Sequence, residues 1–257
     1  MAKLYVGVVL HGFSPTLAEG LNSILQSRLT FPTKFVILDN GSPNPHELTP
    51  VLDAIKTDPR VSVVVSNTNK GCGGGWNTCI MEAYNDPEFE WIVLVGPDVF
   101  VHPDAINNLV LRYLEGGVDI TSGVDCNWED PMPELSPQEV PGANFVFIML
   151  PKIVTDTVGL FDEVNFPVAY HEDNDWHSRA KIAGCGNGIW TWQAPCRHVR
   201  SSTIRRYPNL AKHFEESRSN FIKKWGVGVA DLNKIPAIKE ADERWAAEFN
   251  NMQERRK

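Results

Sequence analysis

Apolar and polar residues alternate in blocks along the first half of the chain. The unbroken apolar run at 4–10 is typical of a strand that is covered on both faces. Leu17, Leu21 and Ile24 recur at the spacing of one helix face. Continued along the chain, this pattern predicts strands at 4–10, 35–38, 61–65, 91–95 and 118–123, and helices at 17–29, 47–56, 77–84 and 103–115.

The second half of the chain is less regular. It predicts strands at 144–150 and 188–192, helices at 173–183 and 211–225, and a charged helical tail at 239–257. The stretch 125–141 carries four prolines, several acidic residues and Trp128, and it is expected to be a long surface loop. Such a loop is either a lid over a site or a connector.

The order of these elements indicates an α/β fold. Strands that alternate with helices form a mainly parallel, Rossmann-like mixed sheet with helices on both faces. At 257 residues, the chain is expected to form a single domain at 1–226 with a charged helical extension at 227–257. Ligands of such sheets bind beyond the carboxyl ends of the strands, where Asp39, the segment 69–77 and Asp98 all fall.

Composition narrows the class of protein. The net charge of −8 argues against a general nucleic-acid-binding surface. The five cysteines lack paired spacing, and no C-x-x-C occurs, which favours reduced thiols and a cytoplasmic location over a zinc knuckle. No stretch is apolar for long enough to span a bilayer, and the first apolar run is too short for a signal peptide.

Two acidic clusters carry the strongest chemical signal. Asp98 follows the strand at 91–95 and can hold Mg²⁺ or Mn²⁺ together with diphosphate oxygens and a histidine such as His198. A strand-end turn and a structural histidine are the alternatives. Glu172 and Asp173 begin a helix, where one can organise the site while the other takes a proton from an acceptor hydroxyl. Acidic residues are also favoured at a helix N-terminus by the helix dipole.

Other strand ends supply candidates for nucleotide binding. Asp39 can accept the imide N–H of uracil or thymine, or it can close an Asx turn. The segment 69–77 contains four glycines before a helix, which allows a ribose or phosphate to approach the backbone, although it lacks the signature of a P-loop. Asp104 is a weaker carboxylate candidate because it is placed to cap the helix at 103–115.

Aromatic residues near these positions are candidates for binding an acceptor. A flat sugar face packs well on an indole ring, and Trp128, Trp176 and Trp192 fall near the predicted site. Most of the remaining aromatic side chains are expected in the core.

Together, these motifs resemble glycosyltransferases of the GT-A fold, specifically family 2 in its inverting, rhamnosyltransferase-like branch. The resemblance covers residues 3–226 and keeps the order of the family's motifs. The matching segments are L-N-S-I-L at 21–25, V-I-L-D-N-G-S at 36–42, N-x-G…N at 69–77, V-L-V-G-P-D at 93–98, and V-G-L-F-D-E at 158–163 followed by E-D-x-D at 172–175.

The resemblance implies an inverting transfer from a UDP- or dTDP-sugar by direct attack of an acceptor hydroxyl. It implies Asp173 as the base, with Glu172 as the next candidate, and Asp98 and His198 as ligands of Mn²⁺ or Mg²⁺. Gly96 replaces the first acid of the family's D-x-D motif, which predicts weak metal binding or activity that is partly independent of metal. The implied nucleotide-sugar contacts are His11, Asp39, Asn69, Gly71, Asn77, Pro97 and Asp98.

Two other functions stay open at this stage. A non-catalytic member of the fold would bind a nucleotide sugar or a glycan, but binding alone needs no base such as Asp173. A nucleotidyltransferase usually carries a basic, glycine-rich loop after its first strand, whereas 11–14 reads His-Gly-Phe-Ser. Slow hydrolysis of a nucleotide sugar would separate these classes.

The acceptor and the oligomeric state are left open by the sequence. A glycan, a lipid-linked sugar, a protein and a modified nucleic acid all stay possible as acceptors. A local basic stretch could meet a phosphate-bearing acceptor or the donor diphosphate, or it could be a solvated face. It consists of Arg197, Arg200, Arg205, Arg206, Lys223 and Lys224.

Overall fold

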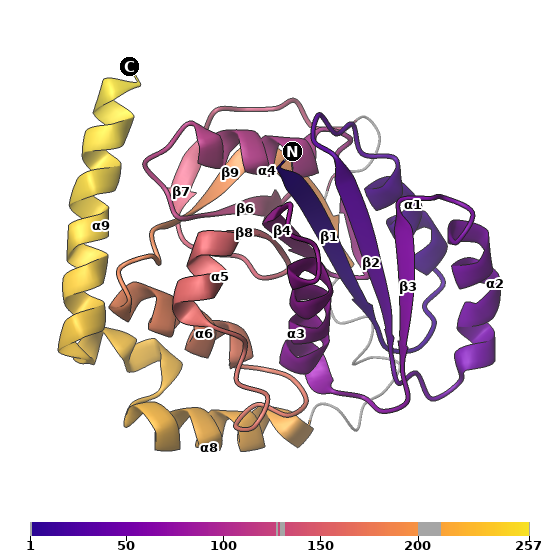
Figure 1. The fold of residues 1–257 in the computed structure, drawn as a ribbon. Helices are drawn as coiled ribbons and strands as arrows, with labels where there is room; N and C mark the ends of the chain where they lie inside the picture. The colour runs from indigo at the N-terminus through magenta and orange to yellow at the C-terminus, as the bar shows by residue number, and fades with distance from the viewer. Residues whose placement is uncertain (1, 127, 129–131, 200–211, 257) are drawn as a thin grey trace.

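The computed structural model describes residues 2–126, 128, 132–199 and 212–256 (Figure 1). Its strands are β1 Lys3–Leu10, β2 Thr33–Asn40, β3 Val61–Ser66, β4 Phe89–Val95, β5 Val99–Val101, β6 Ile120–Asp125, β7 Glu139–Pro141, β8 Phe147–Pro151 and β9 Gly188–His198. Its helices are α1 Leu17–Leu25, α2 Pro45–Ile55, α3 Gly71–Tyr84, α4 Ala105–Leu114, α5 Lys152–Val158, α6 Glu172–Ile182, α8 His213–Trp225 and α9 Pro236–Arg255, with a 3₁₀ helix at Val229–Lys234.

The strands form one mixed sheet in the order β3-β2-β1-β4-β8-β6-β9-β5, with β7 beside β9. β1 to β4 are mutually parallel, as expected for strands joined by crossover helices. β8 runs antiparallel to both β4 and β6, whereas β6 and β9 are parallel. The predicted α/β class, a sheet between helices followed by a C-terminal helical stretch, is confirmed.

The side chains of each strand alternate between two hydrophobic cores. Val6, Val8 and Val93 face the core that α1, α2 and α4 cover, while Tyr5 and Ile92 face the core under α3, α5 and α6. Because both faces are buried, the central strands are almost continuously apolar. This burial explains why unbroken apolar runs located β1, β2 and β4 in the sequence.

The structure differs from the predicted elements in several places. The strand expected at 188–192 extends to His198, and β5, β7 and α5 were not predicted. The expected loop at 125–141 contains β7, where Glu139 is buried beside the guanidinium of Arg112. Arg256, just after α9, also contacts Glu139, with Nη1–Oε1 at 2.8 Å. Nothing in the proline-rich segment around Glu139 indicated that this charged side chain would be buried.

The C-terminal helix α9 packs against the edge of the sheet (Figure 1). Trp245 and Phe249 form a small core with Val118 and Ile189, and the indole N–H of Trp245 donates to Gly188 O at 3.2 Å. The division of the chain at 226/227 stays a prediction. Among the described helices, none is long and apolar enough to cross a membrane.

Candidate active site

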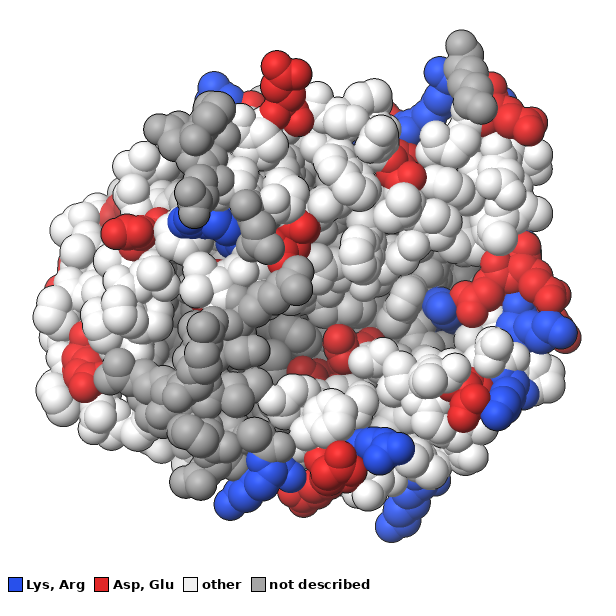
Figure 2. Space-filling model, turned by 180° about the vertical axis from the view of Figure 1, so that it is seen from behind, with Lys and Arg blue, Asp and Glu red and all other residues white. Residues whose placement is uncertain are grey.

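Two adjacent cavities open at the carboxyl ends of β1, β2 and β4. The first, of about 220 Å³, lies between the ends of β1 and β2 and the start of α3. The second, of about 510 Å³, lies between the turn after β4 and the start of α6. Both are lined by Cys72, Trp76, Gly96, Pro97, Ala169 and Tyr170. The face shown in Figure 2 is hollowed near its middle, and acidic atoms are visible in the hollow.

Most of the site residues predicted from the sequence line these cavities. Pro97 lines both of them. The first cavity also has His11, Asn69 and Gly71 in its wall. The second has Asp98, Glu172, Asp173 and His198. The fold therefore brings together side chains that are up to 187 positions apart in the sequence, although their roles in binding and catalysis stay predictions.

Hydrogen bonds hold His11 and Asn69 together in the first cavity. His11 Nδ1 lies 3.2 Å from Asn40 O, and His11 Nε2 lies 3.3 Å from Asn69 Nδ2. Asn40, a further lining residue, donates from Nδ2 to Gly71 O at 2.8 Å and accepts from Lys70 N–H at 3.1 Å. Asn40 thus ties the turn before α3 to the end of β2. Its place directly after Asp39 was the sequence signal for this role.

The glycine-rich segment is the first part of a helix rather than a loop. α3 begins at Gly71, whose φ of +72° suits glycine, and a Cβ there would lie 2.3 Å from Pro167 O. A Cβ on Gly75 would lie 2.6 Å from Val9 Cγ1 in the sheet. The helix predicted to start at 77 therefore starts six residues earlier. Gly75 thus permits close packing of the helix on the sheet, while Gly73 and Gly74 lie against Phe161 and Glu163. Contact of Gly71 with a nucleotide sugar stays a prediction.

Asp39 has the local role that the sequence left open. Its Oδ1 accepts the N–H of Ser42 at 3.0 Å, which holds the turn after β2 in the manner of an Asx turn, and its side chain is buried. Ser42 Oγ in turn accepts the N–H of Gly12 at 2.7 Å, so the turn is joined to the end of β1. Recognition of a base by Asp39 stays a prediction.

Asn77 is a structural residue, and its predicted contact with a nucleotide sugar is wrong. The side chain is buried and lines neither cavity. Its Nδ2 donates to Phe161 O at 2.9 Å, and its Oδ1 accepts from Phe161 N–H at 2.8 Å. The side-chain amide of Asn77 therefore bonds to both the N–H and the C=O of Phe161, in the way that the backbone of a neighbouring strand would.

We expect Asn77→Ala to lower the free energy of unfolding by about 2–4 kcal/mol, because two buried backbone groups of Phe161 would lose their partners. Thr78→Ala, which removes a hydroxyl bonded within α3, serves as the control and is expected to cost less. Urea unfolding monitored by tryptophan fluorescence gives the free energies. A variant of normal stability that has lost nucleotide affinity would restore Asn77 to the binding site.

The turn between β4 and β5 sets Asp98 against His198. β5 pairs antiparallel with the end of β9, with Val99 opposite His198, and Val199 N–H donates to Asp98 O at 2.8 Å. Asp98 Oδ1 and His198 Nε2 lie 3.4 Å apart at one edge of the second cavity. A carboxylate oxygen and an imidazole nitrogen at this separation suit a shared divalent ion such as Mn²⁺.

The protein side of this candidate metal site consists of two ligands. Among the described residues, no group of three or more His, Cys, Asp or Glu side chains is placed to hold a metal ion. A Cβ at Gly96 would lie 3.2 Å from Asp98 Oδ1 and 3.1 Å from Val99 Cγ2. A side chain at position 96 would therefore crowd Asp98, so the missing first acid of the D-x-D pattern agrees with the local packing. An ion here would need further oxygen ligands from the donor diphosphate.

Glu172 and Asp173 occupy different electrostatic environments at the start of α6. Burial raises the pKa of Glu172 to about 8, and the neighbouring charge of Asp173 acts in the same direction. Burial also raises the pKa of Asp173, whose Oδ1 accepts from Asn174 N–H at 2.7 Å and from Asn174 Nδ2 at 2.8 Å. At neutral pH, Glu172 therefore holds a proton while Asp173 is the better candidate for the ionised carboxylate.

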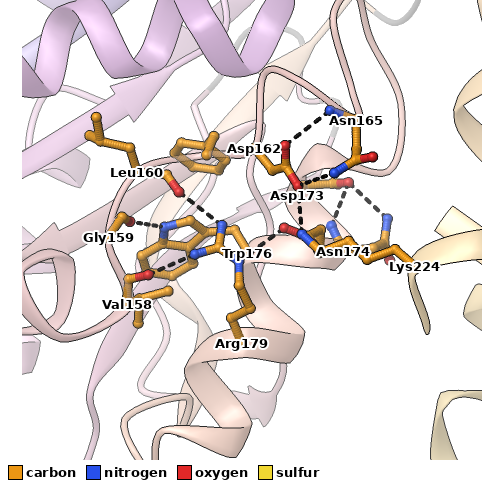
Figure 3. A network of polar contacts seen from close by, with 12 residues as sticks. Val158, Gly159, Leu160, Asp162, Asn165, Asp173, Asn174, Trp176, Arg179 and Lys224 are labelled. Atoms are coloured by element: carbon orange, nitrogen blue, oxygen red, sulfur yellow. Dashed lines mark hydrogen bonds and ion pairs between the residues drawn. The ribbon is translucent and has the colours of Figure 1, made fainter. Parts of the chain in front are cut away.

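A network of polar contacts fixes the orientation of α6 (Figure 3). Arg179 donates to the carbonyls of Val158 at 2.7 Å and Leu160 at 2.9 Å. The fully buried carboxylate of Asp175 lies 3.0 Å from Arg179 Nε and 2.6 Å from Lys224 Nζ. Asp175 thus anchors α6 to α8, so the last acid of the E-D-x-D segment is a structural residue.

Trp176 belongs to this anchor, and its predicted role in acceptor binding is wrong. Its side chain has no exposed surface, its ring stacks on Phe161 with centroids 5.6 Å apart, and its indole N–H donates to Gly159 O at 2.8 Å (Figure 3). Trp128 and Trp192 are half-buried and line neither cavity. The aromatic residues that do line the second cavity include Tyr170 and Phe214, neither of which was predicted as an acceptor residue.

The described part of the basic stretch does not converge on the cavities. The guanidinium of Arg197 lies over the ring of Phe100, 4.2 Å from its centroid. Lys224 is paired with Asp162 and Asp175. Arg200, Arg205 and Arg206 lie outside the described residues. Within the described lining of the two cavities there is no lysine or arginine.

A mixed sheet with its cavities at the carboxyl ends of the parallel strands fits the GT-A fold that the sequence motifs led us to expect. Residues 5–130 match the family model described as Glycosyl transferase family 2. The predicted resemblance to family 2 is thereby confirmed for residues 5–130, whereas the rhamnosyltransferase-like branch stays a prediction. No curated protein matches the chain significantly in sequence.

Solved structures with the same fold are distant in sequence. Mannosyltransferase PcManGT from Pyrobaculum calidifontis, in complex with GDP-Man and Mn²⁺, has a TM-score of 0.62 at 16% identity over 95% of this chain and 74% of its own. GalNAc-T7 with UDP, GalNAc and Mn²⁺ has a TM-score of 0.62 at 12% identity over 95% of this chain and 54% of its own. S. aureus TarS 1-349 has a TM-score of 0.58 at 13% identity over 93% and 71%. These likenesses establish the fold.

Proposed function

We propose that this glycosyltransferase moves a sugar from a nucleoside-diphosphate sugar to an acceptor hydroxyl with inversion at the anomeric carbon. One observation carries the proposal. The Asp98–His198 pair and Asp173 line the second cavity, which adjoins the first cavity, where we place the nucleoside. A leaving-group site and a base in one cavity permit direct displacement in a single step.

The leaving diphosphate requires positive charge that the described cavity walls do not supply. With no lysine or arginine in that lining, Asp98 and His198 are the groups placed to hold a divalent ion there. When bound, such an ion neutralises the charge that develops on the departing diphosphate. Because one of the two protein ligands is an imidazole, we favour Mn²⁺ over Mg²⁺. Two of the similar structures were also solved with Mn²⁺.

Asp173 is the group that we assign as the general base. It takes the proton of the acceptor hydroxyl while the hydroxyl oxygen bonds to the anomeric carbon. The bond from that carbon to the phosphate oxygen breaks, and its electron pair leaves with the nucleoside diphosphate. Glu172 is less suited to this task, because its pKa of about 8 leaves it protonated at neutral pH. It can instead donate a hydrogen bond within the site.

Hydrolysis of the donor in the absence of an acceptor tests this function directly. The protein is incubated with UDP-, dTDP- and GDP-sugars and Mn²⁺, and the products are followed by NMR. Slow release of a nucleoside diphosphate, with an inverted anomeric configuration in the first-formed sugar, is expected from at least one donor. Tight donor binding without any turnover, even when a saccharide panel is added, would indicate a binding protein. A sugar 1-phosphate product would indicate nucleotidyl transfer.

A further inference from the structure

An exposed aromatic ring in the second cavity is not explained by binding of the donor. Phe214, in the first turn of α8, has 40% of its surface exposed and lines the second cavity but not the first. Its ring stands edge-on to Tyr170, with centroids 5.1 Å apart, and tilted against His171, at 5.4 Å. These three rings form a continuous aromatic wall next to the carboxylates of the cavity.

The backbone beneath this wall is strained. Tyr170 has a φ of +75° and His171 a φ of +69°, in the left-handed region that residues with a Cβ rarely adopt. They are the only non-glycine residues with positive φ among the described residues, and they directly precede Glu172 and Asp173. Strain of this kind persists where surrounding contacts enforce it, and it concentrates at functional sites. Here it aligns two rings of the wall with the start of the acidic helix.

The chemistry of the cavity walls narrows the ligand class. The ring faces suit an apolar surface, whereas Asn174 and Asp173 supply hydrogen-bonding groups at the same wall. His171 Nε2 is buried without a hydrogen-bond partner among the described residues. Burial lowers the pKa of His171, so its imidazole is neutral and does not attract anions. A ligand with an apolar face and many hydroxyl groups, and without negative charge, fits all of these features.

We propose that Phe214, Tyr170 and His171 form the acceptor subsite, and that the acceptor is a neutral saccharide with one ring face packed on Phe214 and one hydroxyl directed to Asp173. This inference rests on the proposed function, because it names the acceptor class of the same site. Beside the aromatic wall, the described lining of this cavity offers a phosphate-bearing acceptor the carboxylate of Asp173 and no lysine or arginine. On the described residues, we therefore favour a neutral acceptor over the phosphate-bearing one that the basic stretch had left open.

The experiment compares Phe214→Ala with a matched variant on the same helix. Ile222 is also 40% exposed on α8 but lines neither cavity, so Ile222→Ala is the control. The probes are methyl glycosides of glucose, galactose, mannose, rhamnose and N-acetylglucosamine. Their binding is measured without donor by saturation-transfer NMR, and their effect on nucleoside diphosphate release is measured with donor.

We expect at least one glycoside to bind the wild type and to accelerate nucleoside diphosphate release. Phe214→Ala should weaken its binding, and raise its KM, about tenfold, with a smaller change in the KM of the donor. Phe214→Tyr retains a ring and should restore binding, while Ile222→Ala should behave as the wild type. A rescue by tyrosine distinguishes a binding ring from one that merely supports the fold.

Three results would overturn the inference. If Phe214→Ala raised the KM of the donor more than that of the acceptor, the ring would belong to the binding site of the donor sugar. Tighter binding of glucose 6-phosphate than of methyl glucoside would exclude a neutral acceptor. Failure of every glycoside to bind a wild type that hydrolyses donor would exclude the saccharide class and leave the proposed function intact. Because binding is measured without donor, a lack of donor hydrolysis would count against the proposed function alone.

Discussion

Replacing Asp173 with asparagine is expected to lower kcat for sugar transfer by about 10²–10⁴-fold, the usual contribution of a general base. Asparagine keeps the shape of the side chain and the hydrogen bonds from Asn174, but it cannot take a proton. Affinity for the nucleoside diphosphate should be retained, since Asp173 lines only the second cavity. Steady-state kinetics with the best donor, together with calorimetric binding of the free nucleoside diphosphate, measure both quantities.

Glu172→Gln is the matched control for this prediction. A carboxyl with a pKa of about 8 is neutral at pH 7, so a neutral amide of the same shape should lower kcat less than about tenfold. If Glu172→Gln were inactive and Asp173→Asn active, Glu172 would be the base.

The pH profile of the wild type provides a further readout of the same assignment. Transfer needs Asp173 without its proton, so kcat should fall as the pH drops through the pKa of Asp173. Because burial raises that pKa, the fall should occur at a higher pH than an exposed aspartate would give. The acidic limb should be absent from the residual activity of Asp173→Asn.

The parts of the fold that were predicted correctly are those whose residues are buried on both faces. β1, β2 and β4 were visible as apolar runs because α1 to α4 cover both sides of them. β5 and β7 have three residues each, which is too short for a period to be recognised. The early start of α3 was hidden by its glycines, whose low helix propensity is outweighed by close packing on the sheet.

The predicted site residues fall into two groups for a physical reason. His11 and Asp98 follow strands and lie in the cavities because the carboxyl ends of parallel strands meet at one edge of the sheet, whereas Asp39, inside the end of its strand, is buried. Asn77 and Trp176 lie within helices, where the face of the helix decides between core and cavity. Both point into the core, and the one-dimensional pattern around each did not determine that face.

Phe214 illustrates what the sequence could not indicate. It occurs in an amphipathic helix where a phenylalanine is expected to be buried, and only the packing of α8 beside α6 leaves it exposed in the cavity. That packing depends on Lys224 and Trp225, which contact the buried carboxylate of Asp175 at 2.6 and 3.0 Å. Contacts between residues some 50 positions apart thus place an acceptor residue that the helix pattern alone would assign to the core.

Asp98→Ala is expected to lower kcat/KM in the presence of Mn²⁺ by roughly 10²–10³-fold, because the leaving diphosphate would lose the ion that neutralises it. The described cavity walls contain no lysine or arginine that could replace this charge. The structure also predicts an effect on binding, which can be measured without turnover. Mn²⁺ should strengthen binding of the nucleoside diphosphate to the wild type, and this enhancement should be lost in Asp98→Ala. Calorimetric titrations with and without Mn²⁺ measure it.

Asp104→Ala is the control, because Asp104 was the weaker carboxylate candidate and lies outside both cavities. Its Oδ1 accepts from the exposed Arg28 Nε at 2.7 Å, and the Asp104 side chain is partly exposed, so its loss should change neither turnover nor Mn²⁺-dependent binding. Equal Mn²⁺ enhancement in the wild type and Asp98→Ala would remove Asp98 from the metal site. Activity of the wild type that persists in a chelator would show instead that, with Gly96 in place of the first acid, the charge on the leaving group is balanced without a metal ion.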